Sequence, residues 1–320
     1  MAKLSLILLF LLLTTESPVP NSARPPERNQ PTMAYDSSRH RVLLFGGWKK
    51  DNGLYDDTWT WSGGWTQERA SGPAARASHA LAFDGARGVT LLFGGDGEKS
   101  KLGDTWESNG TRWTKKAEDG PPHRSAHQMV YDSKRKRVVL FGGSDAEDVG
   151  LGDTWEWDGK RWHQQSTSGP PGRFHHAMAF DAARGRVLLF GGRDRGGKQK
   201  GRSLDDTWEW DGARWNRRDV PGPAARDHHA MTYDAARKRV VLFGGATESG
   251  FSGETWEWDA TAWPRIATLP ETPRAKPALV YDARRRVSLL YGGAAAGFTL
   301  LDDMRSWDGK TWRSVDRQPR

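Results

Sequence analysis

The sequence predicts an all-β protein, a six-bladed β-propeller with four antiparallel strands in each blade. One unit recurs six times, because a Gly-Gly pair begins at residues 46, 94, 142, 191, 244 and 292, at spacings of 48, 48, 49, 53 and 48 residues. An apolar run precedes each pair, and a tryptophan follows later in every copy. One four-stranded unit cannot bury both faces of its sheet, whereas six units in a ring pack against one another.

The fourth copy illustrates the first two strands of the unit, A and B. Residues 176–181, HAMAFD, alternate between larger and small side chains, which predicts a strand with two different faces. Residues 186–190, RVLLF, form a continuous apolar run before Gly191-Gly192, which indicates a strand buried on both faces. The polar turn DAARGR joins the two strands.

The third copy illustrates strands C and D in residues 151–162, LGDTWEWDGKRW. Tryptophans and carboxylates at this density are typical of sugar-binding clefts, but near-copies of the stretch occur in the other five units. A column that recurs around a ring is most simply structural. We therefore expect Trp155 and Trp157 of strand C, and Trp162 at the start of strand D, to pack between blades. The Asp-Gly pair between them is a turn.

The amino-terminal end predicts export. A charged tip is followed by the apolar run LSLILLFLLL and a polar stretch, which is the pattern of a secretory signal peptide covering residues 1–23. The chain has no cysteine, which excludes disulfides and thiol chemistry and fits a bacterial periplasmic or extracellular protein. The propeller is then expected over residues 24–320, with blades at about 24–71, 72–119, 120–168, 169–221, 222–270 and 271–320.

The repeats resemble those of the Kelch-repeat β-propeller family. The resemblance rests on the six Gly-Gly runs, such as RVLLFGG at Arg186 and RVVLFGG at Arg239, and on the trailing tryptophans at 65, 113, 162, 215, 263 and 312. It implies that strand A lines a central channel and that the face formed by the B–C and D–A loops binds ligands or partners. All six copies look complete, so we expect no strand exchange where the ring closes.

Two enzymes of this fold give contrasting expectations. Galactose oxidase shares this type of propeller, but its copper site needs a cysteine cross-linked to a tyrosine, so the resemblance to it stops at the fold. Bacterial sialic-acid mutarotases are exported six-bladed Kelch propellers that act on an anionic sugar, and they provide the alternative function for this chain.

An arginine heads strand A in every copy, and a carboxylate heads strand C on the same rim. The two columns permit either structural ion pairs or a ring of arginines that attracts an anionic ligand, and both hold if only some arginines are paired. Glu254 is the one glutamate in the carboxylate column, where it either reaches the channel or reflects neutral drift. The arginines are Arg28, Arg76, Arg124, Arg173, Arg226 and Arg274, and the carboxylates are Asp57, Asp104, Asp153, Asp206, Glu254 and Asp303.

A histidine column lies in strand A at His79, His127, His176 and His229, with prolines at 31 and 277 in the blades beside the seam. The simplest interpretation is four buried, hydrogen-bonded side chains. Blades 4 and 5 add His175 and His228 one residue earlier, with Asp227 beside them. Two imidazoles and a carboxylate suit a metal or acid–base chemistry, but no third metal ligand is identifiable.

The B–C loops differ most between copies. Trp48, Tyr55, Phe251 and Phe298 lie in these loops, where exposed aromatics suit sugar or peptide binding, or else pack their own loops down. The fourth loop, residues 193–205, is the longest and is rich in cations. It is either a solvated insertion or an anion-binding lid.

The A–B turns, on the opposite rim, carry fifteen Lys and Arg residues against six strand-end aspartates, in a chain of net charge +8. Such a one-sided field favours contact with an anionic surface, although a merely solvated turn surface is also consistent with it. We expect no nucleic-acid partner, because the protein is predicted to be exported.

We therefore predict a non-catalytic, exported and monomeric binding module. Its loop face at the channel mouth binds a protein or an anionic or carbohydrate ligand, without catalytic residues, metal or cofactor. The candidate ligand-binding residues are Arg76, Arg124, Arg173, Arg226, His175, His228, Asp227, Glu254, Trp48 and Tyr55.

Overall fold

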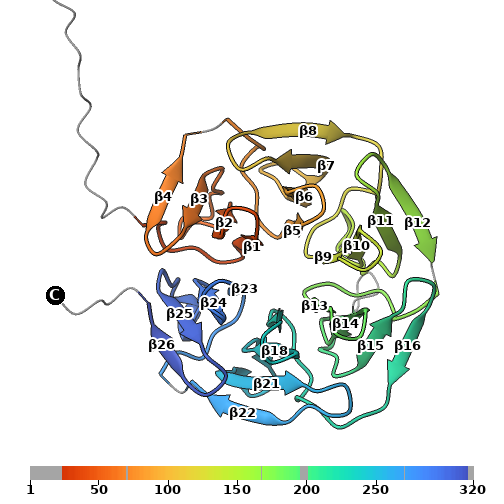
Figure 1. Cartoon of the computed structure of the whole chain (residues 1–320), viewed down its shortest axis with the longest axis vertical. Helices are drawn as coiled ribbons and strands as arrows, with labels where there is room; N and C mark the ends of the chain where they lie inside the picture. Colours follow the sequence, from red (N-terminus) through yellow and green to blue (C-terminus); the bar gives the residue numbers. More distant parts are fainter. Residues whose placement is uncertain (1–23, 70, 167, 195–200, 270, 316–320) are drawn as a thin grey trace, which may run out of the picture.

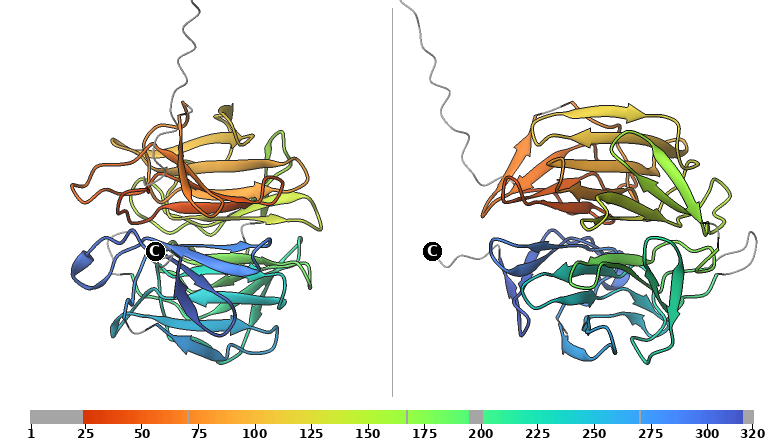
Figure 2. Two further views of the ribbon diagram at one scale, coloured as in Figure 1. Left: turned by 60° about the vertical axis from the view of Figure 1, so that its left-hand side comes forward. Right: turned by 45° about the vertical axis from the view of Figure 1, so that its right-hand side comes forward.

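The computed structural model describes residues 24–69, 71–166, 168–194, 201–269 and 271–315. These residues form six four-stranded antiparallel sheets around a central axis (Figure 1). In the turned views of Figure 2, the orange-to-lime blades and the green-to-blue blades lie on opposite sides of that axis. The predicted signal peptide, residues 1–23, lies outside the described residues. In the described part of the chain, no helix is long and apolar enough to cross a membrane.

The first three blades each use four consecutive strands. Blade 1 contains β1 (Thr32–Asp36), β2 (Arg41–Phe45), β3 (Thr58–Trp61) and β4 (Trp65–Glu68). Blade 2 contains β5 (Ala80–Asp84), β6 (Val89–Asp96), β7 (Lys101–Ser108) and β8 (Trp113–Ala117). Blade 3 contains β9 (Gln128–Asp132), β10 (Arg137–Phe141), β11 (Thr154–Trp157) and β12 (Trp162–Ser166).

The last three blades repeat the pattern, with a small hairpin added in blade 5 and a short helix in blade 6. Blade 4 contains β13 (Ala177–Asp181), β14 (Arg186–Phe190), β15 (Thr207–Trp210) and β16 (Trp215–Arg218). Blade 5 contains β17 (Ala230–Asp234), β18 (Arg239–Phe243), β21 (Glu254–Trp258) and β22 (Arg265–Thr268), plus the hairpin β19 (Ala246–Thr247) and β20 (Gly250–Phe251). Blade 6 contains β23 (Ala278–Asp282), β24 (Val287–Tyr291), the 3-10 helix η1 (Ala296–Phe298), β25 (Met304–Trp307) and β26 (Trp312–Ser314).

The predicted fold class is confirmed, including closure without strand exchange. Each sheet runs in sequence order from strand A at the centre to strand D at the rim, and no blade borrows a strand from another. The B strands are buried on both faces, as the continuous apolar runs predict: in β14, Val187, Leu189 and Phe190 are fully buried.

Neighbouring blades are joined by a repeated hydrogen bond between strands D and C. The indole Nε1 of Trp215 in blade 4 donates to Oγ1 of Thr154 in blade 3, at 2.9 Å. The tryptophan of the opening motif does the same, because Trp162 donates to Thr105 of blade 2 at 2.9 Å. The same bond joins Trp113 to Thr58 at 3.0 Å, Trp263 to Thr207 at 3.1 Å and Trp312 to Thr255 at 2.8 Å.

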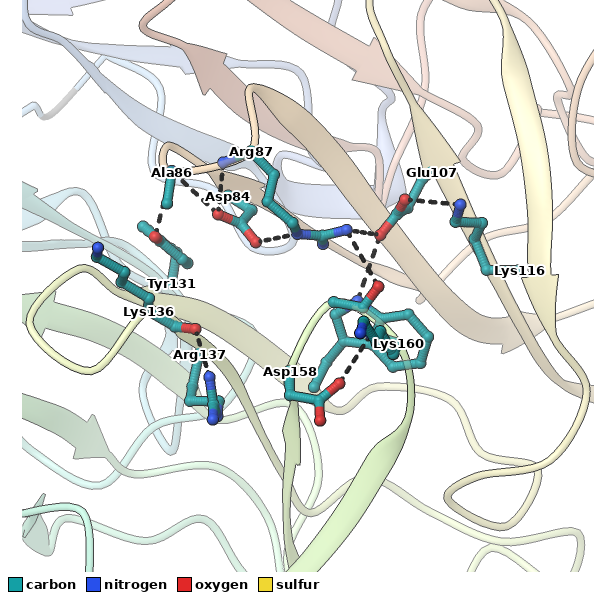
Figure 3. Close-up of polar contacts among 12 residues, drawn as sticks. Asp84, Ala86, Arg87, Glu107, Lys116, Tyr131, Lys136, Arg137, Asp158 and Lys160 are labelled. Carbon is teal, nitrogen blue, oxygen red and sulfur yellow. Dashed lines mark hydrogen bonds and ion pairs between the residues drawn. The ribbon is translucent and has the colours of Figure 1, made fainter.

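A second link joins the C strands through arginines of the A–B turns (Figure 3). Arg87 of blade 2 bonds Asp84 at 2.7 Å and Glu107 at 2.5 Å. Glu107 in turn accepts a hydrogen bond from the indole of Trp157 in blade 3, at 3.3 Å. The glutamate of the TWEW motif is therefore a bridge between an arginine of its own blade and the next blade's tryptophan.

The junction between blades 6 and 1 departs from this pattern. Met304 stands where the other C strands carry threonine, and Nε1 of Trp65 has no hydrogen-bond partner among the described residues. Other contacts join the two blades, and the tyrosine contact among them also occurs at other junctions, as between Tyr131 and Ala86. The guanidinium of Arg285 lies 4.4 Å from the centre of the Trp61 ring, and Oη of Tyr35 accepts from the backbone N–H of Arg284 at 3.2 Å.

We predict that Thr154→Val lowers the free energy of unfolding by about 1–3 kcal/mol, because the buried indole N–H of Trp215 then loses its acceptor. Urea unfolding followed by circular dichroism measures the change. Thr232→Val is the control, since Thr232 is also buried, at 9% exposure, but its hydroxyl makes no hydrogen bond in the described part of the chain. Equal losses in the two variants would contradict this role for the threonine column.

Candidate functional site

Two cavities lie along the axis of the propeller. The first is the central channel, about 400 Å³ in volume, which is lined by the A strands as the family resemblance implies. The second, about 340 Å³, opens above it on the loop face, and we call it the funnel. The funnel is lined by Gln30, Trp48, Ser78, Asp96, Ser125, Ala126, Ser144, Asp148, Phe174, His175 and Lys276.

A ring of six residues, one from each blade, forms the neck between the two cavities. These residues all have left-handed backbone conformations, with φ between 51° and 60°, and they are Gln30, Ser78, Ala126, His175, His228 and Lys276. In five of the six blades, the backbone N–H of the neck residue donates to the carbonyl of the neck residue of the preceding blade, as from His228 to His175 at 2.9 Å and from Lys276 to His228 at 2.8 Å. In blade 2, Oγ of Ser78 donates to Oε1 of Gln30 at 3.0 Å. These bonds hold an uncommon conformation that points the neck residues towards the axis.

The neck is chemically richest in blades 4 to 6. The imidazole rings of His175 and His228 stack with their centres 3.6 Å apart. Nδ1 of His228 hydrogen-bonds Oδ1 of Asp227, whose other oxygen accepts from Ser203 at 2.7 Å. The structure thus brings together the three residues that the sequence singled out, and places Lys276 next to them in the ring.

Burial governs the charge of this group. Burial and the neighbouring His228 hold the pKa of His175 well below its ordinary value. Burial also lowers the pKa of His228, although the contact with Asp227 opposes the change. Both imidazoles are therefore neutral at pH 7, and they act as hydrogen-bonding groups. Among the described residues, no three His, Asp or Glu side chains are placed to hold a metal ion.

The arginine column is fully buried and paired. In blade 3, Arg124 makes two parallel hydrogen bonds to Asp153, at 2.6 and 2.8 Å, and a third to the carbonyl of Gly142 at 3.0 Å. The same clamp occurs in five blades, and in blade 5 Arg226 makes one bond to Glu254 and one to the carbonyl of Gly244. All six arginines are inaccessible to solvent. An anionic ligand therefore meets no free guanidinium from this column, because each charge is neutralised by a carboxylate of its own blade. This applies to the four candidate residues Arg76, Arg124, Arg173 and Arg226.

The backbone of the same arginines explains the Gly-Gly pairs. The N–H of Gly47 donates to the carbonyl of Arg76 in the next blade at 2.9 Å, and an equivalent bond crosses every junction, including Gly293 to Arg28 at 3.1 Å. A Cβ atom on Gly46 would lie 2.4 Å from that carbonyl oxygen, and Gly46 has a φ of 63°. Only glycine fits such a position.

Glu254 takes the place of aspartate in the clamp of blade 5. It accepts from Arg226 at 2.8 Å and from Arg265 at 3.0 Å, and it lines neither axial cavity. Of the two alternatives for Glu254, the structure does not have the side chain reaching the channel, because the two arginines hold it within the blade. Burial raises the pKa of Glu254, but the bonds from Arg226, Trp256 and Arg265 outweigh burial and hold this pKa at about 2.

The histidine column differs from its simplest interpretation. The side chains are buried as expected, but both ring nitrogens of His127, His176 and His229 lack a hydrogen-bond partner within the described ranges. Each ring packs edge-on against a phenylalanine of the preceding blade, as His127 does against Phe93 with centres 5.5 Å apart. Burial lowers the pKa of His127 to about 3, so the column is neutral.

The aromatic residues of the B–C loops lie in different parts of the structure. Trp48 lines the funnel, whereas Tyr55 lies between the cations of Arg28 and Lys49, at 4.0 and 5.0 Å from its ring centre, outside the funnel. Phe251 and Phe298 contact each other, and Phe298 is 69% exposed. In the long loop of blade 4, residues 195–200 lie outside the described residues, and Arg202 pairs with Asp194 at 2.9 Å.

Several funnel residues were missed from the sequence, namely Lys276, Asp96, Asp148 and Phe174. Lys276 was detectable, because it belongs to the column just before the histidines, where the six copies read Gln, Ser, Ala, His, His and Lys. Asp96, Asp148 and Phe174 come from loops whose relative positions depend on the closed ring.

We predict that the stability contributed by Glu254 depends on pH. Its pKa is depressed from 4.5 to about 2 on folding, so its contribution is present above pH 4.5 and is lost as the pH falls towards 2. Urea unfolding at a series of pH values measures this. The Glu254→Gln variant should lose less stability than the wild type across that window, and parallel curves for the two proteins would contradict the assignment.

Comparisons with known proteins agree with the geometry. Residues 156–319, just over half of the chain, match the KLHDC2/KLHL20/DRC7 Kelch-repeats domain family. The solved structure described as "Structure of YjhT" superposes with a TM-score of 0.73 at 16% identity, covering 91% of this chain and 98% of that one. None of the curated proteins compared with the chain matches it. The chain belongs to the Kelch-repeat family.

Proposed function

We propose that the protein is a non-catalytic binding module that holds a carbohydrate or a similarly hydroxyl-rich ligand in the funnel. The observation that carries this is the composition of the cavity wall, where the aromatic side chains of Trp48 and Phe174 share about 340 Å³ with carboxylates, hydroxyls and an amine. Aromatic faces pack on the apolar face of a sugar ring, while the polar groups fix its hydroxyls. The volume falls in the usual range for small-ligand pockets, about 300–1,000 Å³.

The polar groups of the funnel are divided between its two sides. Asp96 and Asp148 come from blades 2 and 3, and Lys276 comes from blade 6. Asp148 bonds Nζ of Lys101 at 2.7 Å, whereas Lys276 forms no ion pair with any residue in the described part of the chain. A hydroxyl group both donates and accepts hydrogen bonds, so a polyol satisfies the carboxylates on one side of the funnel and the amine on the other at the same time.

Export is part of the proposal. The apolar run at residues 4–13, and the absence of cysteine, support a bacterial protein that acts in the periplasm or outside the cell. A funnel open on one face and a neck built from backbone hydrogen bonds also suit a preformed receptor, since little ordering is needed on binding.

A sialic-acid mutarotase-like activity is the second candidate. It is favoured by the neck, where a neutral His228 is oriented by Asp227 as a general acid–base group requires. The buried arginines do not support it, because among the described residues they leave Lys276 as the one cation that lines the funnel. NMR measurement of anomer exchange in sialic acid tests this candidate, and exchange no faster than in buffer would remove it.

We predict that isothermal titration with a panel of glucose, glucosamine and glucuronate detects binding of at least one sugar, and that Trp48→Ala weakens it by about tenfold, the loss of one aromatic contact. Phe298→Ala is the matched control, because Phe298 is an exposed loop aromatic that does not line the funnel. The proposal fails if no sugar in the panel binds, or if the two variants weaken binding equally.

A further inference from the structure

The rim opposite the funnel is formed by the A–B turns, and its cations divide into two groups. One group is paired within its own blade. In blades 3 to 6 it consists of Arg135, Arg184, Arg237 and Arg285. In blades 1 and 2 it consists of Arg39, paired with Asp36, Arg41, paired with Glu68, and Arg87, paired with both Asp84 and Glu107. These three are all the Lys and Arg residues of the A–B turns in blades 1 and 2. Glutamates of the outer strands, which the sequence count left out, thus neutralise part of this rim.

The second group makes no ion pair with any described residue. It consists of Lys134, Lys136, Arg137, Arg186, Lys238, Arg239, Arg284 and Arg286, and we call it the basic arc. All eight residues belong to blades 3 to 6. The five outermost, at 134, 136, 238, 284 and 286, are exposed at the tips of their turns. Lys160 lies in the neighbouring C–D turn, next to Asp158 (Figure 3).

The aspartates that end the A strands do not offset the arc. The aspartate that ends each A strand is buried, at 4% exposure or less, and its oxygens bond the turn that follows. Asp132, for example, accepts from the backbone N–H of Lys134 at 3.0 Å and from the guanidinium of Arg135 at 2.7 Å. The lysines at the turn tips therefore face solvent, and they form no ion pair with any described residue.

We propose that the basic arc docks the protein on a bilayer surface that carries anionic phospholipid. The arc extends over four blades, and the turns of blade 3 and blade 6, which lie across the ring from each other, both contribute to it (Figure 1). Cations that are distributed over the width of a disc can contact a flat anionic surface at the same time. A linear polyanion instead binds best to cations that lie along one line. No large apolar side chain is exposed in the described part of this rim, so the contact is electrostatic and does not insert into the bilayer.

Docking through the arc leaves the funnel facing away from the membrane, because the loop face and the turn face are opposite ends of the same strands. The inference is independent of the proposed ligand. An interaction of this kind weakens steeply as salt screens the charges, over a Debye length of about 10 Å at 0.1 M salt.

Vesicle flotation tests the proposal, with vesicles of phosphatidylcholine alone or mixed with phosphatidylglycerol, at low and high NaCl. The protein should float only with the anionic vesicles and only at low salt. Lys134→Gln/Lys136→Gln should weaken this binding by about tenfold. Lys50→Gln/Lys99→Gln, on exposed loops of the opposite face, is the matched control with the same change in net charge and should bind as the wild type does.

Three outcomes would overturn the proposal. They are binding that is as strong at high salt as at low salt, an equal loss in the two double variants, and tighter binding to soluble polyphosphate than to the anionic vesicles. The last result would assign the arc to a linear polyanion. A retained circular dichroism spectrum and a retained response to the sugar panel show that the variants are folded.

Discussion

The architecture depends on one buried arginine in each blade. Its side chain joins the start of strand A to the end of strand B and the start of strand C, because it bonds both a glycine carbonyl and a carboxylate, as Arg173 bonds Gly191 and Asp206. Its backbone joins that blade to the preceding one through the Gly-Gly pair. A charge with no exposure to solvent is tolerated only when it is fully paired, so the arginine and its carboxylate constrain each other.

The outer part of the ring is held by a different set of contacts, and this set is incomplete. The tryptophan–threonine bond crosses five junctions, but blade 6 has Met304 in the threonine column. The arginine–glycine backbone bond crosses all six. Closure of the ring therefore relies on the inner bonds, together with the contacts of Tyr35 and Arg285 at the seam. This explains how a propeller closes without exchanging a strand.

Repetition determined what could be predicted from the sequence. The strands, the Gly-Gly pairs and the packing role of Trp157 and Trp162 follow from columns that occur six times, and the structure has them as predicted. The sequence does not decide whether the arginines are free or paired with the carboxylates, because the spacing places the two columns on one rim without fixing the distance between them. The funnel was harder still, since Trp48, Asp96 and Lys276 come from three blades and meet only when the ring is closed.

The ring of arginines is structural and is distinct from the funnel above it, which is the proposed binding site. The stability of an arginine variant tests this distinction most directly. Arg173→Met should lower the free energy of unfolding by about 3–5 kcal/mol, because Asp206, which is only 13% exposed, then loses the charge that neutralises it. Arg217→Met, at an exposed pair with Asp219, should lower it by about 0–1 kcal/mol. If Arg173→Met lowers the free energy of unfolding by less than about 1 kcal/mol and also abolishes ligand binding, the structural role is contradicted. The arginines would then belong to the binding site.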